Sequence, residues 1–189
     1  MDKMKNSAVL RNGTQRTAKE VFEKYAIVIA FLALLIVVSI LCSSFLTPSN
    51  LILVLNQTSI NGILAVGITY VLITAGIDIS IGSVVGLSGV ISAMVVKAGA
   101  PLPVGFLCGI LAGTLVGVII GILVTKGKLA PYIVTLGFLT IIRGAALLIA
   151  GGRPISSLGD AYGWIGNHNV FGVIPCPVII FLIVVVIGH

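Results

Sequence analysis

Residues 104–125 read VGFLCGILAGTLVGVIIGILVT, a stretch without a single charged side chain. The hydrocarbon core of a bilayer, about 30 Å thick, is crossed by about 20 residues of α-helix, so this stretch can span a membrane. Its glycines recur every four residues and share one helix face, where they allow a neighbouring backbone to approach closely. We therefore predict a buried helix of a bundle, with five packing glycines: Gly105, Gly109, Gly113, Gly117 and Gly121.

Further apolar segments lie at about 25–46, 51–76, 79–96 and 131–150, and an incomplete one begins at about 177. The chain is 58% hydrophobic and only 8% charged, whereas soluble domains carry roughly a quarter of charged residues. We predict an all-α, polytopic transmembrane bundle with broken or re-entrant helices over residues 25–189. It should contain about five complete spans, the third only just long enough. The last segment is too short to span, so we also expect an amino-terminal fragment of a longer protein.

Basic residues divide unequally between the two predicted sides of the membrane. An arm over residues 1–24 holds six of them, and Lys126 and Lys128 belong to a loop on the same side, whereas Lys97 and Arg153 belong to the other. The positive-inside rule then predicts a multi-pass protein of the plasma (inner) membrane with a cytoplasmic amino terminus. Because the arm runs directly into an apolar segment, nucleic acid is not an expected partner. The six arm residues are Lys3, Lys5, Arg11, Arg16, Lys19 and Lys24.

Polar side chains within the apolar segments are costly unless they face a cavity or a partner, so they are candidates for a substrate pathway. For the group in the second segment, hydrogen bonding between helices is an equally good explanation. For Asp78 the alternative is capping of the following helix, and for Arg143 it is pairing inside the bundle. The candidate pathway residues are Asn56, Gln57, Asn61, Asp78, Ser80, Ser83, Thr135 and Arg143.

The stretch from Gly76 to Gly82 predicts an interrupted helix. Non-helical backbone at membrane depth is tolerated only where protein or a water-filled cavity satisfies its polar groups. Transporters place substrate sites at such breaks, so this feature indicates a transport pathway.

No pattern for catalysis or cofactor binding is present in the sequence. Cys42, Cys108 and Cys176 are isolated, without the spacing of a metal site. Gly127-Lys128 is followed by Leu129 rather than Ser or Thr, so a Walker-type nucleotide loop is absent. We expect a transport subunit without enzymatic activity, cofactor or metal.

Four stretches resemble the signature regions of bacterial ABC importer permeases of the ribose/xylose/galactose type. They are residues 73–89 (ITAGIDISIGSVVGLSG), 127–137 (GKLAPYIVTLG), 142–144 (IRG) and 151–155 (GGRPI). The resemblance runs in order from about Pro48 to the end of the chain. It implies a permease that takes a ribose-like monosaccharide from an extracytoplasmic binding protein, driven by a separate cytoplasmic ATPase, with a second permease copy as a further partner. Members of this family are typically longer, and the loop that docks the ATPase lies beyond the point where this chain stops.

Two other functions stay open at this stage. An ion-coupled secondary transporter needs a titratable site within the membrane, for which Asp78 is the only candidate. A truncated membrane anchor without transport activity is the other alternative.

Overall fold

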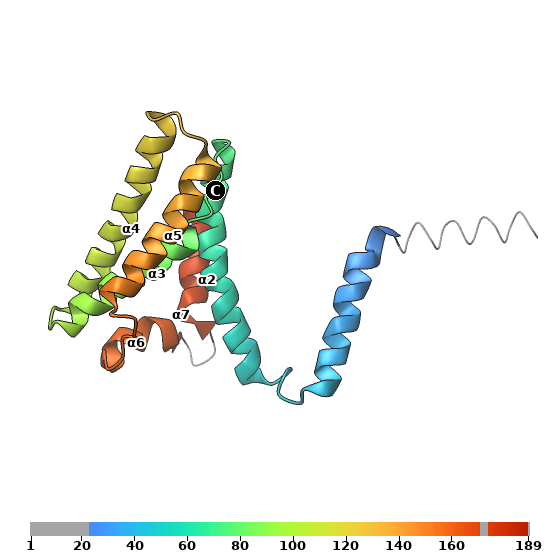
Figure 1. Ribbon diagram of the computed structural model, residues 1–189. Helices are drawn as coiled ribbons and strands as arrows, with labels where there is room; N and C mark the ends of the chain where they lie inside the picture. Colours follow the sequence, from blue (N-terminus) through green and yellow to red (C-terminus); the bar gives the residue numbers. More distant parts are fainter. Residues whose placement is uncertain (1–22, 171–173, 189) are drawn as a thin grey trace, which may run out of the picture. The chain divides into compact units, whose positions relative to one another are not determined.

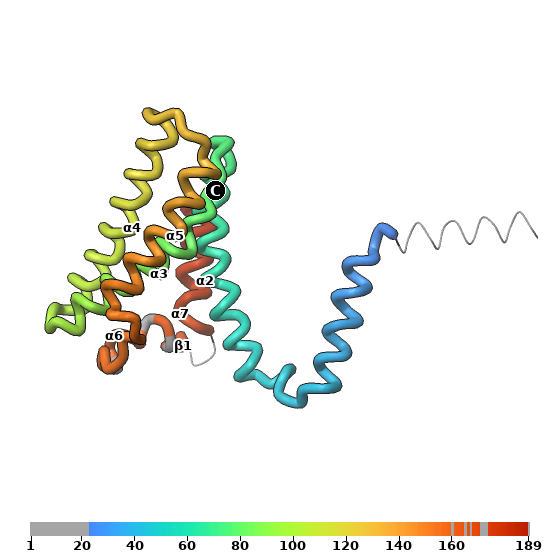
Figure 2. Tube along the Cα trace, viewed as in Figure 1, coloured from blue at the N-terminus to red at the C-terminus, as the bar shows by residue number. Residues whose placement is uncertain are grey.

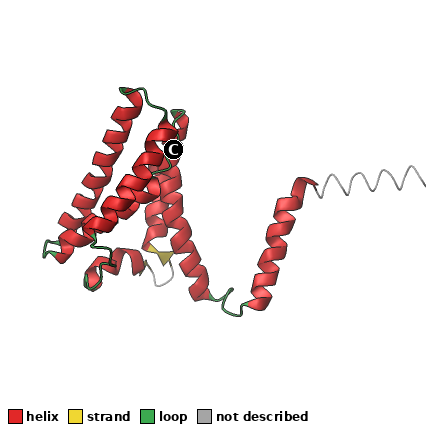
Figure 3. Cartoon of the chain, in the orientation of Figure 1, coloured by secondary structure: helices red, strands yellow, loops and turns green. Residues whose placement is uncertain are grey.

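The computed structural model describes residues 23–170 and 174–188, and nearly all described elements are α-helices (Figure 3). They form two compact units that divide between Leu53 and Val54. The first contains a helix over Glu23–Leu41 and the beginning of α2, which spans Pro48–Ile73. The ammonium of Lys24 lies 5.6 Å from the centroid of the Tyr25 ring. The other basic residues of the predicted arm lie outside the described residues.

The second unit contains the rest of α2 and five further helices. Figure 1 shows α4 and α5 beside each other with α3 behind them, and α3 contacts α4 most extensively and then α5. A proline stands in the first two positions of α4, α5 and α7, where a missing N–H costs no helical hydrogen bond. The predicted all-α membrane bundle is confirmed. The helices are α3 (Ile81–Lys97), α4 (Leu102–Thr125), α5 (Pro131–Ile149), α6 (Asp160–Asn167) and α7 (Cys176–Ile187).

Four of the five predicted spans are confirmed as helices long and apolar enough to cross a membrane: Glu23–Leu41, α2, α4 and α5. The third segment, predicted to be only just long enough, forms a shorter apolar helix. Helix α3 has 17 residues, which at about 1.5 Å per residue falls short of a core about 30 Å thick. It begins at Ile81 rather than at residue 79 because Ser80 is held in a turn by Asp78.

The first three glycines of the predicted packing series lie against α3. A Cβ atom at Gly109 would lie 2.8 Å from the carbonyl oxygen of Ser88, and one at Gly113 would lie 2.8 Å from its hydroxyl. A Cβ at Gly105 would meet the side chain of Val96. The close approach of α3 and α4 therefore depends on the first part of the series. A Cβ would meet nothing within 4 Å at either Gly117 or Gly121.

The stretch between α5 and α7 contains α6 and a short antiparallel pair of strands. Strand β1 (Asn169–Val170) pairs with β2 (Ile174–Pro175). Figure 2 shows α6 at one end of the bundle, near the connection between α3 and α4. Tyr162 of α6 stacks on Phe106 of α4, with ring centroids 5.7 Å apart. Helix α6 is thus attached to the helices that it covers.

Helices α2 and α7 are also in contact. A Cβ atom at Gly62 would lie 2.5 Å from the ring of Phe181, so glycine permits this approach. At the far end of α7 the hydroxyl of Tyr70 donates a hydrogen bond of 2.8 Å to the carbonyl of Gly188. The short apolar helix at the end of the chain is therefore part of the second unit.

Candidate functional site

The helix break predicted at Gly76 to Gly82 lies between α2 and α3, and Asp78 organises it. One carboxylate oxygen of Asp78 accepts hydrogen bonds from the N–H (2.8 Å) and the hydroxyl (2.6 Å) of Ser80. Ser80 is fully buried, and its carbonyl accepts the first helical N–H groups of α3, from Ser83 and Val84. Asp78 therefore fixes the residue that begins the helix instead of bonding to the helical N–H groups as an N-cap would.

Two hydroxyls of the predicted set join the break and α3 to α5. Thr135 is 2% exposed, and its hydroxyl lies 2.9 Å from the carbonyl of Pro131 in its own helix and 3.2 Å from the carbonyl of Ile77 in the break. Ser83 donates a hydrogen bond of 2.9 Å to the carbonyl of Leu139. Non-helical backbone at this depth thus finds a polar partner in the neighbouring helix, as a membrane protein requires.

A groove runs between α3 and α5 beyond the break. It consists of two adjoining cavities, one of about 420 Å³ next to Ser83 and one of about 630 Å³ that reaches α6. Gly86, Arg143 and Ala146 line both cavities, so the two meet at these residues. Glycine and alanine leave room here because their side chains are small. We refer to the two cavities together as the α3–α5 groove.

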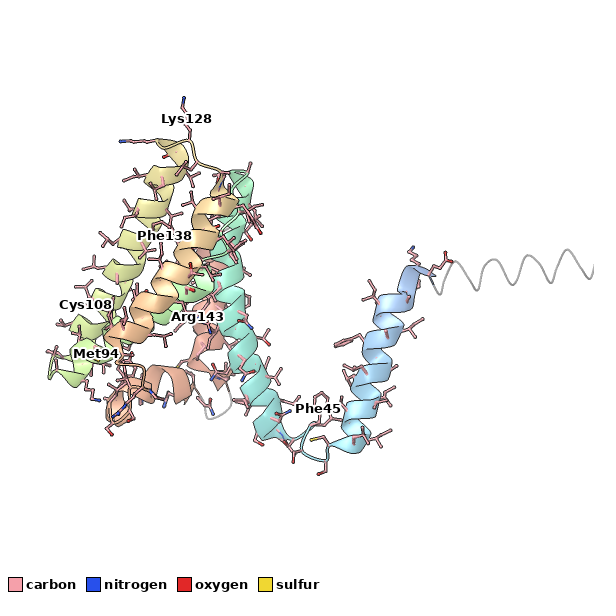
Figure 4. All side chains as sticks on the ribbon, viewed as in Figure 1. Phe45, Met94, Cys108, Lys128, Phe138 and Arg143 are labelled. Carbon is pink, nitrogen blue, oxygen red and sulfur yellow. The ribbon has the colours of Figure 1, made fainter. Side chains whose placement is uncertain are left out.

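Arg143 projects from α5 at the point where the two cavities meet (Figure 4). It lies inside a helix long and apolar enough to cross a membrane. Its guanidinium has no hydrogen-bond or ion-pair partner among residues 23–170 and 174–188. Pairing inside the bundle, the alternative that the sequence left open, is therefore not seen in the described part of the chain. A charged residue at such a position is a functional candidate by default.

The three predicted residues of α2 are not part of this arrangement. Gln57 and Asn61 are exposed, and neither they nor Asn56 line the two cavities of the groove. Asn56 donates a hydrogen bond of 3.0 Å to the carbonyl of Gly166 in α6, while its own amide oxygen is buried without a partner among the described residues. The structure thus brings together Asp78, Ser80, Ser83, Thr135 and Arg143.

The sequence did not single out two residues that line the groove near α6. Arg153 and Tyr162 both line the larger cavity, together with Arg143. In the sequence, Arg153 stood out only as a basic residue on the side of the membrane opposite the arm. Gly151 and Gly152, with φ of 65° and 68°, turn the chain after α5. Only glycine adopts such angles readily, so this Gly-Gly pair was the available signal for a sharp return of the chain.

Comparison with known proteins places the chain in a family. Residues 50–189 match the family described as branched-chain amino acid transport system / permease component. The chain belongs to this permease family. The match begins close to Pro48, where the resemblance noted in the sequence begins, and that resemblance is confirmed.

Curated relatives of this permease include sugar transport proteins. The ribose import permease protein RbsC of Bacillus subtilis (strain 168) is 42% identical over 168 residues, which cover 88% of this chain and 52% of the relative. RbsC of Escherichia coli (strain K12) is 37% identical, covering 82% and 50%. The autoinducer 2 import system permease protein LsrD of Escherichia coli O9:H4 (strain HS) is 35% identical, covering 80% and 49%.

The chain spans about half the length of these relatives. No solved structure gives a significant match. With four helices long and apolar enough to cross a membrane, this family member is a multi-pass integral membrane protein and a transporter component.

Proposed function

We propose that this chain is the membrane-spanning permease of an ABC importer that carries a ribose-like monosaccharide across the plasma membrane. The observation that carries the proposal is the α3–α5 groove, which extends from a broken helix to the end of the bundle and combines hydroxyls with the guanidiniums of Arg143 and Arg153. A neutral sugar needs donors and acceptors rather than a strong counter-charge, and these groups supply them. The names of the curated relatives support the sugar class.

In this mechanism the groove opens alternately to either side of the membrane, and the break between α2 and α3 supplies the backbone that rearranges. The bonds between Asp78 and Ser80 hold the break in one arrangement, and a shift of α5 relative to α3 would exchange the contact between the hydroxyl of Thr135 and the carbonyl of Ile77. Asn56, Gln57 and Asn61 remain proposed pathway residues that would act from α2.

The partners proposed with this function are a separate cytoplasmic ATPase, an extracytoplasmic sugar-binding protein, a second permease copy and the surrounding membrane lipid. Nucleic acid is not among them. The amino terminus is proposed to be cytoplasmic, and so is the loop containing Lys128, which Figure 4 shows at the end of the bundle opposite α6. Helix α6 would then face the binding protein.

A chimeric permease tests the proposal. In it, this chain replaces the part of the Bacillus subtilis ribose permease that it matches, in cells that retain the ribose binding protein and ATPase but lack their own permease. We expect the chimera to restore uptake of radiolabelled ribose. A chimera that inserts into the membrane at normal levels but takes up no ribose would contradict the proposal and favour the membrane-anchor alternative.

Substitutions of Asp78 separate ABC import from ion-coupled transport. Asparagine keeps an oxygen that can accept the bonds from Ser80, so Asp78→Asn in the chimera should retain most ribose uptake. Asp78→Ala loses both bonds and should reduce uptake severalfold, since such a turn contributes about 1 kcal/mol. The measurement is the initial rate of ribose uptake, with and without collapse of the proton gradient. Loss of uptake in Asp78→Asn, or on collapse of the gradient, would favour the ion-coupled transporter.

A further inference from the structure

Arg143 and Arg153 both line one cavity of the α3–α5 groove, and a neutral sugar does not balance their charge. Arg143 extends from the fourth turn of α5, and Arg153 follows the Gly151-Gly152 turn that reverses the chain. Neither guanidinium has a hydrogen-bond or ion-pair partner among the residues that the structure describes. The glycine turn is what allows a residue beyond the end of α5 to line the same cavity as a residue within it.

Arg143 and Arg153 are both exposed, and the cavity wall beside them is largely apolar. Most of the cavity wall is glycine, alanine and aliphatic side chain, including Gly86, Ala93 and Leu147, and such a wall lowers the local dielectric constant. Asp78 is the acidic residue of the second unit whose side chain the structure describes. It lines neither cavity, and its carboxylate accepts a hydrogen bond from Ser80. The described part of the cavity therefore carries positive charge without an internal counter-charge.

We propose that this cavity binds an oxyanion, a phosphate group held between Arg143 and Arg153. A guanidinium matches two oxygens of a phosphate with two parallel hydrogen bonds, and two guanidiniums balance its charge. The phenol of Tyr162 lines the same cavity, and its hydrogen bond to the carbonyl of Gly89 is long, 3.4 Å, so it can be exchanged for one to the anion. A volume of about 630 Å³ accommodates a phosphate with a sizeable substituent.

Such a group has two sources, the head group of an anionic phospholipid or a soluble phosphate. In both cases the two arginines recognise the same oxyanion. The site goes beyond sugar import and does not depend on it, because the proposal concerns binding by this chain alone.

Two binding measurements on the purified chain test the proposal and separate the sources. In nanodiscs of phosphatidylcholine alone, equilibrium binding of radiolabelled inorganic phosphate is measured. In detergent with equal amounts of phosphatidylglycerol and phosphatidylcholine, native mass spectrometry identifies the lipid that is retained. We expect saturable phosphate binding, preferential retention of phosphatidylglycerol, or both. Phosphate binding alone indicates a soluble ligand, and retention of phosphatidylglycerol indicates a lipid.

Four variants show whether the two arginines are responsible. Arg153→Gln and the double variant Arg143→Gln/Arg153→Gln should weaken the binding by roughly tenfold or more, as expected for loss of a charged hydrogen bond. Arg143→Lys should keep most of it, because the charge remains, and shows that the fold tolerates substitution there. Lys126→Gln removes a charge outside the groove and should leave the binding unchanged. The proposal is overturned if the unaltered chain binds neither ligand selectively, or if the double variant binds as well as the unaltered chain.

Discussion

Replacing Gly109 with valine is expected to separate α3 from α4 and to destabilise the second unit. The new Cβ would lie 2.8 Å from the carbonyl oxygen of Ser88 and 3.2 Å from the Cβ of Ser92. Both belong to α3, and a backbone carbonyl cannot rotate away as the end of a flexible side chain can. Overpacking of this kind typically costs about 1–3 kcal/mol, and the valine methyl groups add to it. Thermal unfolding of the purified chain in detergent measures the effect.

Gly117→Val is the matched control in the same helix. A Cβ at Gly117 meets nothing within 4 Å, and the residue is exposed, so the midpoint of unfolding should change little. Equal midpoints for the Gly109 and Gly117 variants would show that the two helices do not meet along this face.

The second large effect is expected from Thr135→Val. Valine has nearly the same shape, but it removes the hydroxyl that reaches the carbonyl of Ile77 in the break, 3.2 Å away. Ile77 is half exposed, so the loss is that of an ordinary hydrogen bond, about 0.5–1.5 kcal/mol, which corresponds to roughly two- to tenfold in the population of the correct arrangement. We expect ribose uptake by the chimeric permease to fall by about that factor at unchanged membrane expression.

Thr140→Val provides the comparison within α5. The hydroxyl of Thr140 is exposed and donates a hydrogen bond of 2.8 Å to the carbonyl of Gly137 in its own helix. Its loss should leave uptake nearly unchanged. If both threonine variants keep full uptake, the link between the break and α5 has no role in transport.

Much of the fold could be predicted because a membrane-spanning helix requires a long run of apolar residues, which is visible in the sequence. The run of residues 104–125 covers α4 except for its first two residues, and the glycine spacing identified a packing face. The spacing could not show which glycines have a neighbour, since that depends on where α3 crosses α4. Gly109 lies against Ser88, whereas Gly117, two turns further along, faces open space.

The local sequence was not enough to predict those elements whose structure depends on tertiary contacts. Helix α6 has eight residues and contains two glycines, too short and too flexible to be stable alone, so its sequence resembles a loop. It forms in contact with the bundle, where Tyr162 stacks on Phe106. The beginning of α3 was placed two residues too early for a related reason, because the Asp78–Ser80 turn holds back a helix that the composition would allow to begin at residue 79.

The candidate site was predictable in its residue types but not in its grouping. Polar residues in apolar segments are few, so Ser83, Thr135 and Arg143 could be selected directly from the sequence. Asn61 was selected by the same argument, yet it lies on an exposed part of α2 and does not line the groove. Hydropathy identifies a polar residue within a span but does not tell which neighbour its side chain faces.

The central claim is that substrate passes through the α3–α5 groove, and cysteine modification at Gly86 tests it most directly. Gly86 lines both cavities, and a Cβ there meets nothing within 4 Å, so Gly86→Cys should fold. The experiment uses the chimera with all its native cysteines replaced by alanine, a small charged thiol reagent, and Gly117→Cys as the control. We predict that modification of Gly86→Cys abolishes ribose uptake, that excess ribose slows the modification, and that Gly117→Cys keeps its uptake. Full uptake by a completely modified Gly86→Cys chimera would contradict the account.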